Sequence, residues 1–285
     1  NLMQVVITFW RAACALPLAW HKILGQFCGS LLLLFANKRR KIAQANIQVC
    51  LPLLSLAEQR KLLHKNFISL GHSLFQTGVA WFWSDARIEK NVAYKITGLD
   101  LLKNHDQSKG NLILFKHSQH LELDARLLGM NIDTFGVARS HNSSTMDVLQ
   151  TTGRLSSIKG TADKNNPRQF VKWLKEGKNV LYAIDQDYGW SNSVELTFFN
   201  NPAATITTTR KIIDMTQCNL LFMNSFYKEK ELNLELEIVS SEGFNANALA
   251  QKINDVMEKS ITLEPAEYLW SHRRFKSTLG KQFYN

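Results

Sequence analysis

From about residue 92 to residue 240, short apolar segments alternate with amphipathic segments of about ten residues. The apolar segments span 111–115, 134–137, 180–184, 196–199 and 219–227, and helical periodicity is seen over 119–129, 143–151, 167–176 and 206–216. Strands that alternate with helices of this length predict an α/β fold with helices on both faces of a sheet. Two longer alternating segments, 219–228 and 231–240, flank the charged turn 228–230, so one edge of the sheet is expected to be antiparallel. We therefore expect a mixed, mostly parallel central sheet flanked by helices.

The first 36 residues are mostly apolar, but Arg11, His21 and Lys22 interrupt them. No uncharged run reaches the roughly 18–20 residues that an unambiguous transmembrane helix needs. The pattern favours a helical hairpin, or an interfacial helix with its apolar face in lipid. It predicts a membrane-associating segment and does not decide whether that segment crosses the bilayer.

A long helix is predicted next. Ser55 followed by Glu58 resembles a capping box, which marks the start of a helix that continues to about Trp83. No Pro/Gly/Ser-rich linker separates this helix from the α/β pattern that follows. We therefore expect an N-terminal helical, membrane-associating region at 1–90 and an α/β core at 91–285, continuous with the preceding helices.

The formal net charge of +10 favours an acidic partner, which means nucleic acid, anionic lipid or an acidic carrier protein. The chain has no zinc-finger spacing, RNA-recognition signature or basic-zipper heptads, so we expect no nucleic-acid partner. A dense basic run at 38–41 directly follows the apolar segment 31–36. That order is typical of a juxtamembrane anchor on an anionic leaflet, although an ordinary solvated helix start has the same composition.

The candidate for chemistry is a histidine just beyond an apolar strand. His117 follows the predicted strand 111–115, and Glu122 comes five positions later in the next predicted helix. In open α/β sheets the loops beyond strand ends form the active-site crevice. Two residues five apart in one helix point about 140° away from each other, so they can meet only if His117 lies in the loop before the helix. Such a pair would hold the imidazole in one tautomer and stabilise the imidazolium.

Spacing alone leaves other interpretations open. His120 and Asp124 are four residues apart on the same predicted helix and could form a simpler dyad. Glu122 and Arg126 have the spacing of an ordinary helix-surface ion pair. A metal site at His117 and His120 would need further ligands, which no HExxH or similar motif supplies.

With its neighbours, the His117-x4-Glu122 motif resembles the signature of the glycerolipid acyltransferase superfamily. More specifically, nearly the whole chain resembles the late acyltransferases of lipid A biosynthesis, the lauroyl and myristoyl acyltransferase family. The resemblance is carried by several blocks in order: Arg39–Ile47, His117–Gly129, Met146–Arg154, Leu174–Gly177, Tyr182–Gly189 and Tyr268–Lys276. The Phe-Pro-Glu-Gly-Thr-Arg block of the wider superfamily is absent, and Asp185–Gly189 stands in its place, which favours the lipid A branch.

This resemblance implies an enzyme that transfers a lauroyl or myristoyl chain from acyl carrier protein to a hydroxyl of a lipid A precursor. His117 would act as the general base while the hydroxyl attacks the thioester, assisted by Glu122, which would orient the ring. No cofactor or metal is implied, because a thiolate is already a good leaving group. The implied location is the cytoplasmic face of a Gram-negative inner membrane, with membrane lipid and the acidic carrier protein as partners.

Other residues acquire expected roles from the same resemblance. Arg154, after a turn-like segment, would stabilise the tetrahedral oxyanion or bind an acceptor phosphate. From its position in the loop after another strand, Arg139 could contact phosphates, or it could belong to an ordinary polar loop. Asp185 and Asp187 end the strand at 179–184 and are expected to brace the site by hydrogen bonds, for instance to Arg154, and Asp187 counts among the substrate-binding candidates.

Three alternatives compete with this hypothesis. One is a non-catalytic protein that binds anionic lipid at a membrane surface, and another is a glycerolipid acyltransferase with a different acceptor. The third is a serine hydrolase of lipids, but the chain has no G-x-S-x-G elbow after a strand, and Ser118 beside His117 is not such a turn. The sequence does not specify the acyl length, the hydroxyl that is acylated or the oligomeric state.

Overall fold

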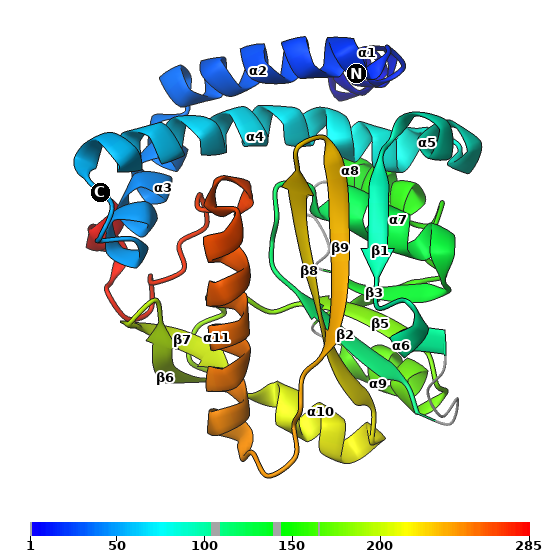
Figure 1. Ribbon diagram of the computed structural model, residues 1–285, viewed down its shortest axis with the longest axis vertical. Helices are drawn as coiled ribbons and strands as arrows, with labels where there is room; N and C mark the ends of the chain where they lie inside the picture. Colours follow the sequence, from blue (N-terminus) through cyan, green and yellow to red (C-terminus); the bar gives the residue numbers. More distant parts are fainter. Residues whose placement is uncertain (1, 104–108, 139–143, 165) are drawn as a thin grey trace.

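A seven-stranded sheet runs through the centre of the computed structural model, which describes residues 2–103, 109–138, 144–164 and 166–285 (Figure 1). Its strands are β1 (Tyr94–Thr97), β2 (Asn111–Phe115), β3 (Thr134–Ala138), β4 (Thr161–Asp163), β5 (Asn179–Ala183), β8 (Asn219–Lys228) and β9 (Glu231–Ile238). Their order across the sheet is β1-β9-β8-β2-β5-β3-β4. A separate antiparallel pair is formed by β6 (Ser193–Phe198) and β7 (Asn201–Ile206).

The strand directions confirm the prediction of a mixed, mostly parallel sheet. β2 is parallel to both its neighbours, β5 and β8, and β3 is parallel to β4 and β5. β8 and β9 pair antiparallel, as the two long alternating segments predicted. The edge strand itself is β1, which is parallel to β9 and was not predicted, because four residues carry too little periodicity.

Helices cover both faces of the sheet and extend along one end of it (Figure 1). The N-terminal helices are α1 (Leu2–Cys14), α2 (Leu18–Phe35), α3 (Asn37–Cys50), α4 (Leu56–Phe82) and α5 (Asp85–Asn91). The remainder are α6 (Asp100–Lys103), α7 (Leu121–Asn131), α8 (Ser144–Arg154), α9 (Pro167–Lys175), α10 (Thr208–Thr216) and α11 (Ala246–Leu263). The predicted capping box is present at the start of α4, where the Ser55 side chain accepts from the Glu58 amide and the Glu58 carboxylate accepts from the Ser55 amide.

The central strand β2 is buried along its whole length. Leu112 and Leu114 belong to the hydrophobic core on one face of the sheet, and Ile113 and Phe115 belong to the core on the other face. Burying side chains of this size stabilises the fold by about 1.5–3 kcal/mol each. The carboxyl end of β2, where His117 follows, is therefore held from both sides.

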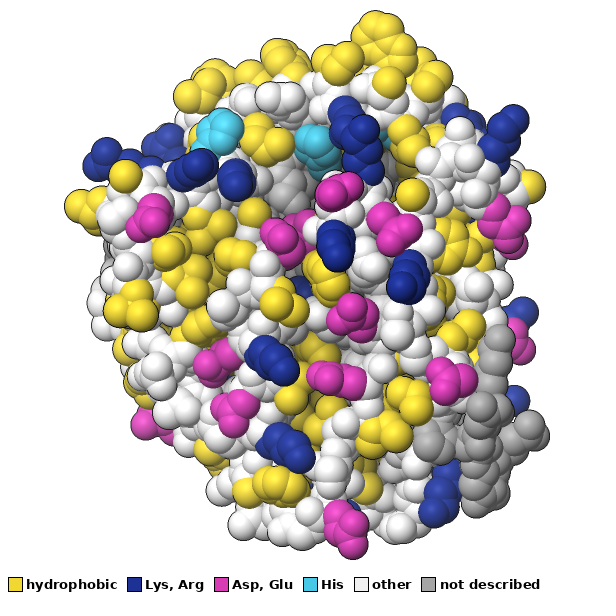
Figure 2. All heavy atoms as spheres, in the orientation of Figure 1, with side chains coloured by type: hydrophobic (Ala, Val, Ile, Leu, Met, Phe, Trp, Pro, Cys, Tyr) yellow, Lys and Arg dark blue, Asp and Glu magenta, His cyan; other side chains and the backbone are white. Residues whose placement is uncertain are grey.

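α1 and α2 form the segment for which the sequence favoured a helical hairpin or an interfacial helix. Both helices pack against α4 and not closely against each other, and α2 runs along the outer side of α4 (Figure 1). Hydrophobic side chains cover the outer surface of α2 (Figure 2). By length and composition, α2 is also long and apolar enough to cross a membrane. Its inner side contacts α4 through glycines, because a Cβ at Gly71 would lie 2.7 Å from the Cα of Gly29 and also close to the carbonyl of Gly25. The two helix backbones are therefore in direct contact.

Because of this backbone contact, we expect a substitution that normally stabilises a helix to destabilise this protein. Gly→Ala inside a helix normally stabilises it by about 1 kcal/mol. We expect Gly71→Ala to lower the free energy of unfolding by about 1–3 kcal/mol instead, because the methyl group must separate two backbones. Urea unfolding measures the change, with Ser69→Ala on the same helix as a control that stays within about 0.5 kcal/mol. A stabilised Gly71→Ala protein would show that α2 does not rest on α4.

Candidate active site

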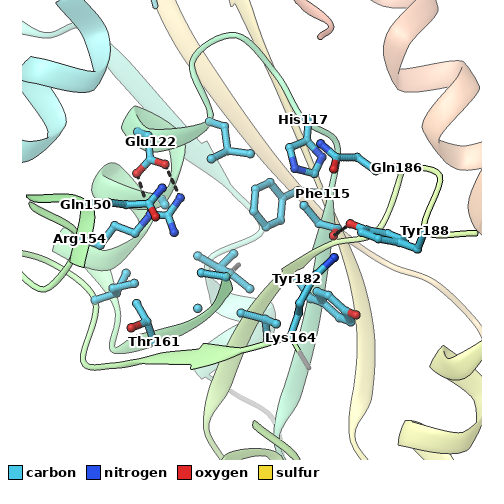
Figure 3. Close-up of a pocket in the computed structure, with 18 residues that line it drawn as sticks. Phe115, His117, Glu122, Gln150, Arg154, Thr161, Lys164, Tyr182, Gln186 and Tyr188 are labelled. Atoms are coloured by element: carbon cyan, nitrogen blue, oxygen red, sulfur yellow. Dashed lines mark hydrogen bonds and ion pairs between the residues drawn. The ribbon is translucent and has the colours of Figure 1, made fainter. Parts of the chain in front are cut away.

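A cavity of about 330 Å³ opens near the carboxyl ends of β2, β3 and β5, the position at which open α/β sheets bind ligands (Figure 3). Much of its wall is apolar and comes from these strands and from the first turns of α7. Its polar lining includes His117, Glu122, Gln150, Arg154, Lys164, Gln186 and Tyr188. Within the part of the chain that the structure describes, the two catalytic residues expected from the sequence, His117 and Glu122, therefore share one cavity with Arg154.

Strand register brings His117 beside Asp185. β2 and β5 are parallel with Phe115 opposite Ala183, so the residues two positions further on leave the sheet next to each other. His117 Nδ1 lies 2.5 Å from Asp185 Oδ1, and the His117 backbone amide donates to Asp185 Oδ2 at 2.9 Å. Both carboxylate oxygens of Asp185 thus contact the same histidine.

Burial alone would raise the pKa of Asp185, but the charge and hydrogen bonds of His117 outweigh it and hold that pKa well below the ordinary aspartate range. Tyr268 also hydrogen-bonds to this carboxylate. An ionised Asp185 accepts a hydrogen bond from a protonated Nδ1 of His117. In the neutral imidazole with its proton on Nδ1, the other ring nitrogen, Nε2, carries a lone pair. The His117 side chain is 24% exposed whereas that of Asp185 is 1% exposed, so the imidazole faces the cavity and the carboxylate stands behind it.

Glu122 has other partners. Its Oε2 accepts from Trp81 Nε1 at 2.9 Å and from Arg154 Nε at 3.0 Å, and its Oε1 contacts Arg154 Nη2. Glu122 and Arg154 lie on one side of the cavity and His117 lies on the other (Figure 3). The first turn of α7 directs Glu122 towards α4 and α8, and no hydrogen bond to His117 is found among the described residues.

The structure therefore sorts the expected site residues. His117 lies in the loop before α7, as the spacing argument required. We expected Glu122 to contact the imidazole, but Asp185 makes that contact. We also expected Asp185 to hydrogen-bond to Arg154, but its contact is with His117. Asp187 is buried and does not line the cavity: it accepts from the amide and hydroxyl of Ser277 at 2.8 and 2.7 Å. Arg139 lies outside the described residues.

The alternative dyad, His120 with Asp124, exists but is shut away from the cavity. His120 is 2% exposed, and its Nδ1 lies 2.7 Å from Asp124 while its Nε2 lies 3.1 Å from Glu267. Asp124 also accepts from the hydroxyl groups of Ser118 and Ser225, each at 2.8 Å. This cluster joins the loop that carries His117 to β8 and to the C-terminal segment.

Hydrogen bonds hold the same loop in place on both sides of His117. The carbonyl of His117 accepts from the Leu269 amide at 3.0 Å, and the Gln119 amide donates to the Glu267 carbonyl at 2.7 Å. On the other side, the buried Lys116 ammonium donates to Asn224, Ser225 and Ser260 at 2.7–3.0 Å. Burial lowers the pKa of Lys116 to about 8.

The proposed ion pair of Glu122 with Arg126 is replaced by a different one. Arg126 Nη2 contacts Asp85 Oδ1 at 2.5 Å and donates to the Trp83 carbonyl at 3.0 Å, which ties α7 to the end of α4. Sequence reasoning missed Trp81 and Tyr268 as neighbours of the site residues. A single signal pointed to Asp185, namely a carboxylate directly after a buried strand.

The chain is similar to known proteins over most of its length. A family model described as "Bacterial lipid A biosynthesis acyltransferase" matches residues 2–277. The chain is 36% identical over 259 residues to the Lipid A biosynthesis palmitoleoyltransferase of Escherichia coli (strain K12), covering 89% of this chain and 84% of that protein. It is 36% identical over 260 residues to the Lipid A biosynthesis lauroyltransferase of the same strain, with the same coverage. It is 32% identical over 284 residues to a Lipid A biosynthesis acyltransferase of Haemophilus influenzae, covering 97% of this chain and 90% of that protein.

The buried cluster behind His117 predicts a pH dependence of stability. Burial lowers the pKa of His120, but Asp124 and Glu267 outweigh it and raise the pKa to about 9. The stabilisation from this raised pKa is complete below the unfolded value, about pH 6.5, and is lost as the pH rises towards 9. Lys116, whose pKa is lowered, has the opposite effect only from about pH 8 upward.

We therefore expect the free energy of unfolding to fall between pH 6.5 and pH 8, by at most about 1.4 kcal/mol per pH unit. In His120→Gln, which is less stable at both pH values, this slope should disappear. Urea unfolding at the two pH values measures both effects. An unchanged slope in His120→Gln would contradict the assignment of the slope to this histidine.

Proposed function

The chain belongs to the bacterial lipid A biosynthesis acyltransferase family, and from this we propose that it transfers an acyl chain from acyl carrier protein to a hydroxyl of a lipid A precursor, with His117 as general base. Family membership makes the chain an acyltransferase enzyme of lipid A biosynthesis. The donor, the catalytic groups and the location at the cytoplasmic face of the inner membrane are parts of the proposal.

One observation carries the catalytic part of the proposal: the contact of His117 Nδ1 with the buried, ionised Asp185, which leaves Nε2 for the cavity. In this mechanism Nε2 takes the proton of the acceptor hydroxyl while its oxygen attacks the thioester carbonyl. Asp185 holds the tautomer and stabilises the imidazolium that forms. The tetrahedral intermediate then expels the carrier thiolate, which regains a proton from the imidazolium, and an ester and a free thiol result.

Glu122 assists from the opposite wall by fixing Arg154. Two nitrogens of the Arg154 guanidinium are held by the Glu122 carboxylate, which Trp81 also holds. A fixed guanidinium at the cavity can stabilise the oxyanion or bind a phosphate of the acceptor, and a preorganised charge is worth more than a mobile one. We propose that Glu122 acts on catalysis through Arg154 and not by contact with the imidazole.

The apolar part of the cavity suits the acyl chain. Phe115, Leu121, Val137 and Leu181 contribute to this lining close to His117. We propose a chain of the lauroyl or myristoyl class. The relatives named for lauroyl and for palmitoleoyl transfer match this chain equally well, at 36% identity each. An assay with donors of different chain length is therefore needed to identify the preferred acyl chain.

Catalytic roles are tested by acyl transfer to a lipid A precursor. We expect His117→Ala and Asp185→Asn each to lower kcat by about 10²–10⁴-fold, because one removes the base and the other removes the charge that orients it. Glu122→Gln should retain more activity than either variant, because it disturbs only the position of Arg154.

Asp187→Asn is the matched control, since Asp187 is a buried carboxylate two residues away that contacts Ser277 and not the cavity. Thermal unfolding verifies that each variant is folded. Equal losses in Asp187→Asn and Asp185→Asn would show that the segment's structure, and not the charge beside His117, is what matters. Full activity of a folded His117→Ala variant would exclude His117 as the general base.

The donor is tested with thioesters of different charge and length. We expect a higher kcat/KM with acyl carrier protein than with the same acyl chain on coenzyme A. The preference should weaken as salt is raised, because attraction between a basic enzyme and an acidic carrier is screened. Lauroyl, myristoyl and palmitoleoyl carriers are compared in the same assay. Equal kcat/KM values for both thioesters at low salt would contradict the carrier proposal.

A further inference from the structure

The C-terminal segment places two buried polar side chains behind the His117–Asp185 pair. This segment follows α11, passes α3 and the β6–β7 pair, and is drawn in red (Figure 1). Tyr268 is 4% exposed and Arg274 is 3% exposed. Together with His272 they line one small cavity of about 10 Å³. A space of this size excludes bulk water, so solvent screens a charge beside it only weakly.

Arg274 is a buried cation without an acid in direct contact. Its guanidinium donates to the Ala204 carbonyl at 2.7 Å and to the Thr205 hydroxyl at 3.1 Å, both in β7. Among the residues that the structure describes, its Nε has no hydrogen-bond partner and no carboxylate forms an ion pair with it. Buried arginines are normally paired with an acid. The charge of Arg274 is therefore balanced over a longer distance.

Three acids lie within electrostatic reach of this cation: Asp185, Asp187 and Glu258. Asp187 and Glu258 accept hydrogen bonds from backbone amides outside the cavity. Asp185 is the one of the three that contacts His117. Burial lowers the pKa of Arg274 and the attraction to Asp185 and Asp187 opposes this, so the guanidinium stays charged near neutral pH. Arg274 and Asp185 thus form a buried pair of opposite charges without touching.

Tyr268 joins the cation to the acid. Its hydroxyl donates to the Asp185 carboxylate. Burial and the charge of Asp185 raise the pKa of Tyr268 while Arg274 lowers it, so the phenol keeps its proton and remains a donor. The backbone here is fixed as well, because the Tyr268 carbonyl accepts from Asn66 Nδ2 at 2.7 Å. Asp185 therefore contacts both the imidazole and a hydroxyl that shares its small cavity with a buried cation.

We propose that Arg274 and Tyr268 are positioning residues that limit the negative charge which Asp185 presents to His117. An unbalanced carboxylate would stabilise the imidazolium so strongly that the ring would keep its proton and could not act as a base. A cation and a hydrogen-bond donor on the same carboxylate weaken this effect, and the ring is neutral when the acceptor hydroxyl arrives. The inference rests on the proposed role of His117 as general base.

Other ionisable groups face His117, and they are the same in every variant compared below. In the cavity, the charges of Glu122 and Arg154 compensate each other. Burial lowers the pKa of His272 to about 4, so this ring is neutral above that pH. The remaining groups are Lys116, His120, Lys164, Tyr182, Asp187, Tyr188 and Lys276. A difference in pH dependence between variants therefore reports the substituted group alone.

The acid side of the pH profile tests the charge of Arg274. We expect Arg274→Gln, which keeps a donor for the Ala204 carbonyl, to raise the pH at which kcat/KM is half-maximal by about one unit. Arg274→Lys keeps the charge and should stay within about 0.3 units of wild type. The matched control is Arg273→Gln, which removes the same charge from a partly exposed neighbour and should also stay within about 0.3 units.

Tyr268→Phe tests the same balance with the cation in place, and it keeps the edge-to-face contact with the Trp270 ring. We expect an upward shift of about half a unit, because Asp185 loses a donor. A second readout needs no acyl transfer. Diethyl pyrocarbonate modifies only the neutral imidazole, so peptide mass spectrometry of modified His117 against pH should show the same shifts in all four variants. Thermal unfolding verifies that each variant is folded.

A merely structural role would lower kcat/KM at every pH and leave both half-maximal pH values in place. Unchanged values in folded Arg274→Gln, or in folded Tyr268→Phe, would therefore overturn the proposal, and so would an equal shift in Arg273→Gln. The base itself is tested separately by the wild-type protein. If modification of His117 shifts as expected but wild-type kcat/KM follows a different pH course, the general base is contradicted and the charge balance is not.

Discussion

The parallel pairing of β2 with its neighbours is the constraint on which the site depends. β2 is buried on both faces, and its hydrogen bonds to β5 place Phe115 opposite Ala183. In a parallel pair the chains leave the sheet at the same end and in the same register. His117 and Asp185 therefore emerge as neighbours, although 68 positions separate them in the sequence. A shift of the register by one residue would turn the carboxylate to the other face of the sheet.

Behind this pair lies a cluster of ionisable side chains, most of them buried. Ionisable groups are rarely buried in proteins unless they have partners. Lys116, His120, Asp124 and Glu267 lie close together in and behind the loop, and each makes hydrogen bonds to neighbouring groups. Buried ions cost free energy to desolvate, and removal of one partner leaves the others uncompensated. A cluster of this kind contributes little net stability, but it permits only one conformation of the loop that it surrounds. The geometry of the imidazole is thus specified by charges that never touch the cavity.

The sequence predicted most of the sheet and the position of His117, because buried strands of five or more residues and a histidine just beyond one of them leave a clear local pattern. The sequence could not identify Asp185 as the partner of His117. β3 and β4 lie between β2 and β5 in the chain, and no local sequence pattern indicates that β2 and β5 are neighbours in the sheet. Glu122 was expected at the imidazole from the family resemblance, and spacing does not reveal the direction in which the first turn of α7 points its side chains. β7 was not predicted either, because Pro202 lowers the strand propensity of a segment that tolerates proline in a two-stranded pair.

The C-terminal segment has a consequence for the order in which the enzyme is made. Asn66 of α4 donates to the Tyr268 carbonyl at 2.7 Å, and the Leu269 amide binds the carbonyl of His117. Both contacts join early parts of the chain to residues that follow them by 202 and 152 positions. During synthesis α4 and the loop around His117 are therefore made long before Tyr268 and Leu269, and the loop lacks this support until both have left the ribosome. A chain that has not yet reached Tyr268 can form its early helices, but it does not yet hold the loop of the acyltransferase site in place.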